Sequence, residues 1–440
     1  MLRYLTILVF IIASFFSITY SCDVAVVSSI AAKDGKPIIW KNRDDPAGVF
    51  FGVRRHEANN PEVGSYICIE ERLYPDLTTI CSAGVNEAGF AIANTNAYTG
   101  SLVKELVSID VPLMEKALSN CKTVECFETL LINAHNHEDK FYVTSSNFVV
   151  IDAYGGAVHY EAYADMREPV EFIKHDANIV NFSNKTNHID LHEIYDSTSE
   201  KRTKRGAELL TEYYNKDELT PKTMMQIVAK DVCNDEDNEQ DLENFDTTFC
   251  ISRAYTRFST VIEGVTPNED PKYTTMWVNV GEPSAGVYVP IYPAAHYIPE
   301  AVNANLMGGA PLNVEIINKE LELYENNGGV FRYLEVLPSI RDMTINKIKL
   351  YDLQDSLTFP LEDTLIEADR EIKQAIKNGE VNYDTEEVLK TFSKDASNYA
   401  YDVYSGKSEL PSRSNLYTFQ MWLRLVFNNS TSLIDTILGR

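Results

Sequence analysis

The chain has 440 residues, of which 44% are hydrophobic, enough for one large domain with additions or for two ordinary domains. Its 39 Lys and Arg residues stand against 65 Asp and Glu residues. The resulting formal net charge of −26 repels phosphate backbones and anionic lipid surfaces, so nucleic acid is not expected as a partner. With 24% charged and 11% aromatic residues, the composition is that of a folded protein and not of a disordered one.

A signal peptide is predicted at residues 1–21. A short basic start is followed by an apolar run over residues 5–16 and then by small or hydroxylated residues. The apolar run is shorter than the roughly 20 residues that span a bilayer. The mature chain is therefore expected to begin at Cys22, to have no membrane span, and to be secreted or periplasmic.

Two other fates of this segment stay open. One is an uncleaved leader that anchors the chain. It stays open because Thr19 and Ser21 form a weak cleavage site. A lipoprotein would carry a lipid on Cys22. Lipoprotein leaders, however, place Leu third before the cysteine and Gly or Ala directly before it, where this chain has Thr19 and Ser21.

The first part of the mature chain is predicted to be rich in β-strands. Short apolar or alternating runs are separated by turn sequences such as KDG, NPEVG and NEAG. The expected strands cover residues 22–30, 37–42, 49–57, 65–70, 78–84 and 90–97.

Helices and further strands alternate after this start. Leu and Ile at helical spacing predict helices at about residues 112–119, 123–136, 202–215 and 221–231. Strands are expected at residues 147–163, a hairpin that turns at Gly155 and Gly156, and at residues 172–183, 249–265 and 273–281. This order, with few parallel-crossover signals, predicts an α+β fold of two antiparallel sheets with helices outside them.

Beyond about residue 300 the chain turns helical and acidic. The segments 361–380 and 385–404 carry apolar stripes that are typical of packing helices. We therefore predict a signal peptide at 1–21, a catalytic domain at 22–300, and a largely helical C-terminal extension at 301–440 that packs on the domain.

Seven cysteines in an exported chain leave one unpaired after three disulfides, and the odd one is assigned to Cys22. The other six form three pairs by proximity in the sequence, although six cysteines allow 15 connectivities. The proposed pairs are Cys68 with Cys81, Cys121 with Cys126, and Cys233 with Cys250. No CxxC spacing is present, and no metal site is expected.

An N-terminal Cys22 would unite a nucleophile and a base in one residue. The α-amine titrates near ~7.7 and can accept the thiol proton at neutral pH. The alternative role for Cys22 is that of a disulfide partner or a small buried apolar residue.

Three spaced motifs accompany this cysteine. The first is Cys22 followed by the turn KDGKP and then WKNRD, which contains Lys41 and ends at Asp44. The second is GVNEAGFAIANTNAY, a tight turn into a strand that ends at Asn96. The third is IVNFS, which contains Asn181.

Together these motifs resemble the N-terminal-nucleophile (Ntn) hydrolases that include isopenicillin-N acyltransferase, penicillin V acylase and the choloylglycine (bile salt) hydrolases. The resemblance spans residues 22–290 and implies a four-layer αββα sandwich. It implies that Asp44 orients the amine and thiol of Cys22, although a solvated turn residue is the alternative. Lys41 occupies a position that differs between members of the family and discriminates poorly.

The resemblance also implies two site asparagines. Asn96 is expected to donate to the oxyanion, with Asn94 as the alternative by register, because Asn94 and Asn96 share one face of a strand and Thr95 faces away. Asn181 is expected as the second, with Asn184 and Asn187 as alternatives.

Other candidate residues receive ordinary roles. Arg253 is similar in position to an arginine near the site of the bile salt branch, but a surface arginine beside Arg257 is the simpler interpretation. His188 and His192 lie in a polar loop and are expected to be solvated. No GxSxG elbow or CGSCW-like segment points to a serine or papain-like hydrolase.

The sequence thus predicts an exported N-terminal-cysteine amidohydrolase that cleaves a linear amide C–N bond of a small molecule through an acyl-enzyme, with no cofactor. The alternatives are an acyltransferase, an N-terminal-cysteine dipeptidase, and a non-catalytic lipoprotein or binding protein. Oligomeric assembly is compatible with this sequence.

Overall fold

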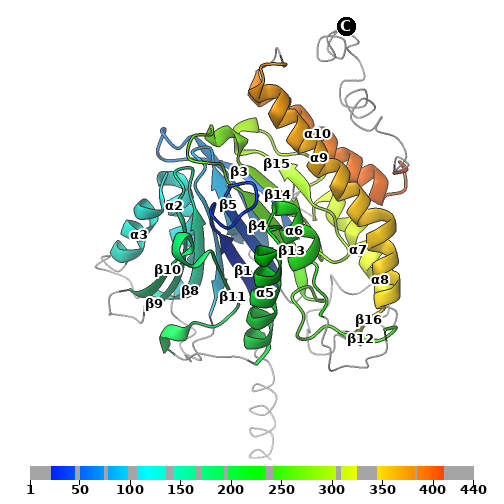
Figure 1. Cartoon of the computed structure of the whole chain (residues 1–440), viewed down its shortest axis with the longest axis horizontal. Helices are drawn as coiled ribbons and strands as arrows, with labels where there is room; N and C mark the ends of the chain where they lie inside the picture. Colours follow the sequence, from blue (N-terminus) through cyan, green and yellow to red (C-terminus); the bar gives the residue numbers. More distant parts are fainter. Residues whose placement is uncertain are drawn as a thin grey trace, which may run out of the picture.

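The computed structural model describes residues 21–44, 50–73, 78–97, 107–108, 110–134, 142–164, 170–192, 197–233, 242–303, 309–324, 344–381 and 384–410. Two sheets lie between helices (Figure 1). Their neighbouring strands run antiparallel except for one two-residue parallel pair, β7 with β8. The α+β class and the two antiparallel sheets predicted from the sequence are confirmed.

The first sheet has six strands in the order β11-β1-β2-β13-β14-β15. Its strands are β1 (Ser21–Val27), β2 (Ile38–Asp44), β11 (Phe182–Lys185), β13 (Thr256–Glu263), β14 (Thr275–Asn279) and β15 (Val289–Ile291). All residues of β2 and β13 are buried, as expected for central strands covered on both faces.

The second sheet has eight strands, with β10-β9-β8-β6-β5-β4-β3 in order and β7 beside β8. Its strands are β3 (Phe50–Glu57), β4 (Ser65–Leu73), β5 (Thr78–Asn86), β6 (Ala91–Asn96), β7 (Val107–Ser108), β8 (Tyr142–Ile151), β9 (Ala157–Ala164) and β10 (Glu171–Asp176). The predicted hairpin is formed by β8 and β9, and its turn residue Gly155 has a φ of 97°, which favours glycine.

Helices cover the outer sides of both sheets. On the second sheet lie α2 (Asp110–Asn120) and α3 (Val124–Asn133), and on the first lies α5 (Ser197–Asn215), which packs against β1 and β11. The helix predicted at 221–231 is a short α6 (Pro221–Thr223) that continues as a π-helical turn, Met224–Val228. Short helical turns are α4 (Ala177–Val180), Asp190–His192, Pro271–Tyr273 and Pro293–Ala295.

Strand alternation divides the core into two parts. Inner residues of the second sheet, such as Ala93 and Val149, meet the apolar strands of the first sheet. The neighbouring residues Ile92 and Phe148 point outward and pack under α2 and α3. This alternation places the polar ends of β6 and β8 next to the apolar core.

The chain beyond residue 300 is mainly helical in its described part. It contains α7 (Pro311–Leu323), α8 (Lys347–Leu353), a π-helical turn (Gln354–Thr358), α9 (Phe359–Lys377) and α10 (Thr385–Tyr404). A small sheet pairs β12 (Phe245–Asp246) with β16 (Thr344–Ile345), and α9 and α10 contact β15. The domain boundary at residue 300 stays a prediction. None of the helices within the described ranges is long and apolar enough to cross a membrane.

Two predicted strands have different bounds. The segment 172–183 is not one strand, because it divides into β10, the turn α4 and the start of β11. The residue between α4 and β11, Asn181, has a φ of 73°, which interrupts extended structure. Within 249–265 only Thr256–Glu263 is a strand.

The three predicted cysteine pairs are present as disulfides. Cys68–Cys81 links β4 to β5, Cys121–Cys126 joins the end of α2 to α3, and Cys233 pairs with Cys250. Cys22 is the free cysteine. Three disulfides are compatible with folding outside the cytoplasm, where oxidation is possible. The predicted signal peptide, apart from its last residue, lies outside the described residues.

Candidate active site

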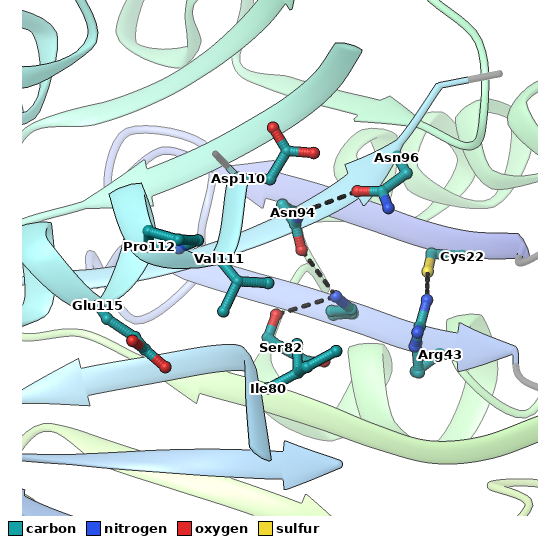
Figure 2. Close-up of a pocket in the computed structure, with 11 residues that line it drawn as sticks. Cys22, Arg43, Ile80, Ser82, Asn94, Asn96, Asp110, Val111, Pro112 and Glu115 are labelled. Atoms are coloured by element: carbon teal, nitrogen blue, oxygen red, sulfur yellow. Dashed lines mark hydrogen bonds between the residues drawn. The ribbon is translucent and has the colours of Figure 1, made fainter. Parts of the chain in front are cut away.

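The pairing of β1 with β2 places Cys22 directly opposite Arg43. The Cys22 side chain is 1% exposed, and Nη1 of Arg43 donates to its Sγ at 3.3 Å (Figure 2). A guanidinium at this distance is a charged hydrogen-bond donor to the sulfur. Arg43 was not predicted from the sequence, because only the register of β1 with β2 reveals its position.

A carboxylate holds Arg43 in place. Nε and Nη2 of Arg43 donate to the two oxygens of Glu71 at 2.5 and 2.7 Å, and the hydroxyl of Ser82 donates to the same carboxylate. Burial raises the pKa of Glu71, but the charge and hydrogen bonds of Arg43 outweigh it and hold that pKa below its ordinary value. The bidentate pair therefore fixes the guanidinium that faces the thiol.

Asn187 contacts the other side of Cys22. Its Oδ1 accepts from the Cys22 backbone nitrogen at 2.7 Å, and its Nδ2 donates to the backbone oxygen of Asn96 at 2.6 Å. One side chain thus connects β1 of the first sheet to the end of β6 in the second. This is the position that the sequence analysis expected for Asn181.

Asn181 lies at the opposite end of β1. Its backbone oxygen accepts from the nitrogen of Ser28, and β11 runs antiparallel from Phe182, opposite Val27, toward the end of β1 that carries Cys22. The structure therefore does not bring Asn181 to the site, and the alternative Asn187 lies there instead. Asn187 was one of the two alternatives to Asn181 that the sequence offered.

The amide of Asn96 has a defined orientation. Its Oδ1 accepts from Nδ2 of Asn94 and from the hydroxyl of Ser146, both at 3.2 Å. The Nδ2 group therefore points away from these donors, and Figure 2 shows it on the side of Cys22. Asn94 and Asn96 line one cavity, whereas Thr95 faces away and donates to the backbone oxygen of Thr186, as the predicted alternation requires.

The ammonium group of Lys41 lies between β5 and β6, where these two strands are no longer paired. These strands pair only from Val85 opposite Ala91 to Ala83 opposite Ala93. Beyond this pairing, Nζ of Lys41 donates to the Ser82 backbone oxygen at 2.9 Å and to Oδ1 of Asn94 at 3.1 Å. Both acceptors are uncharged, so burial lowers the pKa of Lys41 to about 8.

A cavity of about 380 Å³ opens beside these residues. At one side are Cys22 and Arg43, and at the far side is Glu115 of α2 (Figure 2). The complete described lining is Cys22, Lys41, Arg43, Ile80, Ser82, Asn94, Asn96, Asp110, Val111, Pro112 and Glu115. This volume suits a small organic molecule or one segment of a larger one.

Asp44 is buried, but its carboxylate accepts hydrogen bonds from residues other than Cys22. Its Oδ2 accepts from Nε of Arg253 at 2.7 Å and its Oδ1 from the hydroxyl of Thr256 at 2.7 Å. Arg253 is 6% exposed, so the expectation that it is a surface arginine was wrong. The reason is that its partner on β2 lies 209 residues away in the sequence.

Arg202 on α5 was not predicted. This fully buried guanidinium donates through Nη1 to Asp23 at 2.7 Å and to the backbone oxygen of Cys22 at 3.4 Å. Nη2 donates to Oδ1 of Asn187 at 3.3 Å, and Asp44 lies 3.8 Å from Nη1. Burial raises the pKa of Asp23 to about 6, although Arg202 opposes this increase.

Buried polar side chains hold the backbone on both sides of Asn187. The side-chain amide of Asn147 donates to the backbone oxygens of Thr186 and His188, each at 3.0 Å. Its Oδ1 pairs with Nε2 of His159, and burial lowers the pKa of His159 to about 3, so the ring is neutral. His188 is 5% exposed, which corrects its predicted solvation; the side chain of His192 lies outside what the structure describes.

Among the described residues, no group of three or more His, Cys, Asp or Glu side chains is arranged to hold a metal ion.

No protein-family model matches the sequence, and no curated protein matches it. Solved structures do resemble the fold. One is a variant of the conjugated bile acid hydrolase from Clostridium perfringens, with 13% identity, 58% of this chain and 89% of that chain covered, and a TM-score of 0.32. Another is the penicillin V acylase from Agrobacterium tumefaciens, with 16% identity, coverage of 62% and 86%, and a TM-score of 0.35.

A third is the N-acylethanolamine-hydrolyzing acid amidase ortholog from Caenorhabditis elegans, with 13% identity, coverage of 57% and 94%, and a TM-score of 0.35. At these values the chemistry of this chain is inferred from the side chains around Cys22 and not from the superposition.

Proposed function

We propose that the chain is an exported N-terminal-cysteine amidohydrolase of the Ntn type that cleaves a linear amide C–N bond through an acyl-enzyme. The observation that carries this proposal is the environment of Cys22. Its thiol is free and faces a cavity, an arginine contacts its sulfur, and an asparagine binds its backbone nitrogen.

Cleavage after Ser21 would turn the Cys22 nitrogen into an α-amine held by Asn187. The amine takes the thiol proton, and the guanidinium of Arg43 stabilises the thiolate that forms. The thiolate sulfur then adds to the amide carbonyl carbon. The ammonium returns its proton to the leaving nitrogen as the C–N bond breaks, which leaves a thioester and a free amine.

Asn96 is proposed as the oxyanion donor. Because Asn94 and Ser146 occupy its Oδ1, its Nδ2 hydrogens are available to the negative charge that develops on the carbonyl oxygen. Water then attacks the thioester carbon with the amine as general base, releasing the carboxylic acid and the thiol. Asp44 acts indirectly in this proposal, since its contacts hold Arg253, Thr256 and Arg202.

The cavity lining supports a substrate class. Its far wall combines the apolar Ile80, Val111 and Pro112 with the carboxyl groups of Asp110 and Glu115. An anionic group in this part of the cavity would be repelled, whereas an apolar or cationic group would be accommodated. We therefore propose that the substrate portion bound there is neutral or carries an amine, which favours amine-bearing amides and small peptides over conjugated bile salts.

Two alternatives are distinguished by the same site. An acyltransferase would use the same residues with an amine acceptor in place of water, so product analysis with added amines separates it from a hydrolase. A lipid on Cys22 would instead occupy the sulfur that contacts Arg43, so the mass of the mature N-terminus separates a lipoprotein from an enzyme with a free thiol.

The test uses three purified forms: residues 22–440 with a free Cys22, the same chain with one extra N-terminal residue that cannot be trimmed, and Cys22→Ser. They are screened on N-acyl amides, penicillin V, conjugated bile salts and small peptides. Only the first form should hydrolyse any of them, because an amide nitrogen has no basic lone pair and a hydroxyl is a weaker nucleophile. Equal activity of the first two forms would refute the N-terminal-nucleophile mechanism.

A further inference from the structure

Arg202, on a helix that covers the first sheet, interacts with groups of four residues of the site. It projects from α5, is fully buried, and contacts the Cys22 carbonyl, the Asp23 carboxylate and the amide oxygen of Asn187, with the Asp44 carboxylate also within ion-pair distance. These groups belong to β1, to β2 and to the turn after β11. One guanidinium therefore fixes their relative positions.

The burial of this charge requires an explanation. A guanidinium removed from water is stable only where carboxylates and other acceptors replace the water. Asp23 and Asp44 provide the charge, while Cys22 and Asn187 provide neutral oxygens. A surface ion pair would have stabilised α5 as well, so the buried position indicates a role in the site itself.

We propose that Arg202 is a positioning residue for the N-terminal nucleophile, holding the Cys22 carbonyl and the Asn187 amide in the arrangement needed for proton transfer and attack. This inference rests on the proposed function. Because Nη2 of Arg202 and the Cys22 nitrogen bind the same oxygen of Asn187, a fixed positive charge lies beside the future α-amine.

This charge has a predictable effect on pH dependence. A neighbouring cation disfavours the ammonium form of the amine and favours the thiolate form of the sulfur. Removing it should move both ionisations to higher pH, by about one unit for a pair of charges several ångströms apart in a protein site. The other charged groups around Cys22 are Asp23, Lys41, Arg43, Asp44, Glu71 and Arg253, all of which remain in the variants below.

The experiment compares Arg202→Gln and Arg202→Lys with a matched control on the same helix. Arg205 also pairs with an aspartate, through Nη2 and Asp231 at 2.7 Å, but lies one turn further along α5 and does not contact Cys22. Arg205→Gln removes a less buried arginine–aspartate ion pair from the same helix without touching the site. Circular dichroism melts verify that each variant folds.

Two measurements are made on the chain with a free Cys22: the pH profile of kcat/KM, and the pH profile of Cys22 alkylation by iodoacetamide. Arg202→Gln should lower kcat by about 10- to 100-fold with little change in KM, and it should move the acidic limb and the alkylation midpoint upward by about one pH unit. Arg202→Lys should restore the midpoint but not kcat, because an ammonium cannot reproduce the fork of contacts. Arg205→Gln should match the unmodified protein.

Unchanged profiles in Arg202→Gln, or an equal loss in Arg205→Gln, would overturn the proposal. If Arg202→Gln does not fold, Arg202→Lys decides, since normal kcat in that variant would also overturn it. Alkylation does not depend on amide hydrolysis. A shifted alkylation midpoint in a protein that hydrolyses no amide would therefore refute the proposed function while leaving the role of Arg202 intact.

Discussion

Replacing Asn96 tests the oxyanion assignment most directly. Asn96→Ala removes the amide whose Nδ2 faces Cys22, and loss of one such donor lowers kcat by roughly 10²–10³, or about 2.7–4 kcal/mol of transition-state stabilisation. It also removes the oxygen that binds Asn94 and Ser146, so part of any loss would be structural. Asn96→Asp separates the two effects, because it keeps an acceptor for both donors while it loses the N–H groups and adds a negative charge beside the oxyanion, so a purely structural role would leave it active.

The assay is the initial rate on the best amide substrate, together with thermal unfolding of each variant. Both Asn96 variants should lose kcat by at least 10² with modest changes in KM, whereas Ser146→Ala, which removes one of the two donors that orient the amide, should lose no more than about tenfold. Full activity in Asn96→Asp would refute the oxyanion assignment. Loss in Asn94→Ala with normal activity in Asn96→Ala would instead move the role to Asn94.

Three further outcomes are expected. Iodoacetamide applied without reductant to the mature protein should label Cys22 and leave the other six cysteines unmodified, and peptide mapping that finds a second labelled thiol would contradict the three-disulfide arrangement. Because the pKa of Lys41 is about 8, its charge is lost as pH rises through 8. Activity should therefore fall near pH 8 in the unmodified protein and persist to higher pH in Lys41→Arg, and pH–activity profiles that fall at the same basic pH in both proteins would exclude a role for this charge. The folded-state pKa of His159 lies below its unfolded value, so stability should fall as pH drops from 6.5 toward 3, by about 2 kcal/mol down to pH 5, and denaturant titrations should show a flatter dependence in His159→Gln.

The parts of the fold and site that sequence predicted correctly depend on local patterns. The two antiparallel sheets followed from short strands with turn signals between them, and the disulfides followed from proximity along the chain. The shared face of Asn94 and Asn96 followed from strand alternation. The free Cys22 followed from an odd cysteine count.

The parts that were missed depend on register and on helix phase. Arg43, and Asn187, which the sequence offered only as an alternative to Asn181, reach Cys22 through the pairing of β1 with β2 and of β1 with β11, which no local pattern specifies. Arg202 stands in a run of basic residues with Lys201, Lys204 and Arg205, a pattern typical of a solvated helix face. Which of these residues is buried depends on how α5 lies against the sheet.

The packing of α9 has a consequence for how the chain unfolds. Glu362 of α9 is fully buried, forms an ion pair with the buried Lys230 at 3.0 Å, and accepts from the backbone nitrogen of Tyr288. A protein truncated at residue 300 would leave Lys230 buried without this counter-charge. The free energy of unfolding would fall by about 3–5 kcal/mol, which is much of the stability of an ordinary domain. The segment that carries Cys22 and the helices that follow residue 300 are therefore expected to melt in one cooperative transition, and removal of those helices would destabilise the protein without deleting a residue of the described cavity lining.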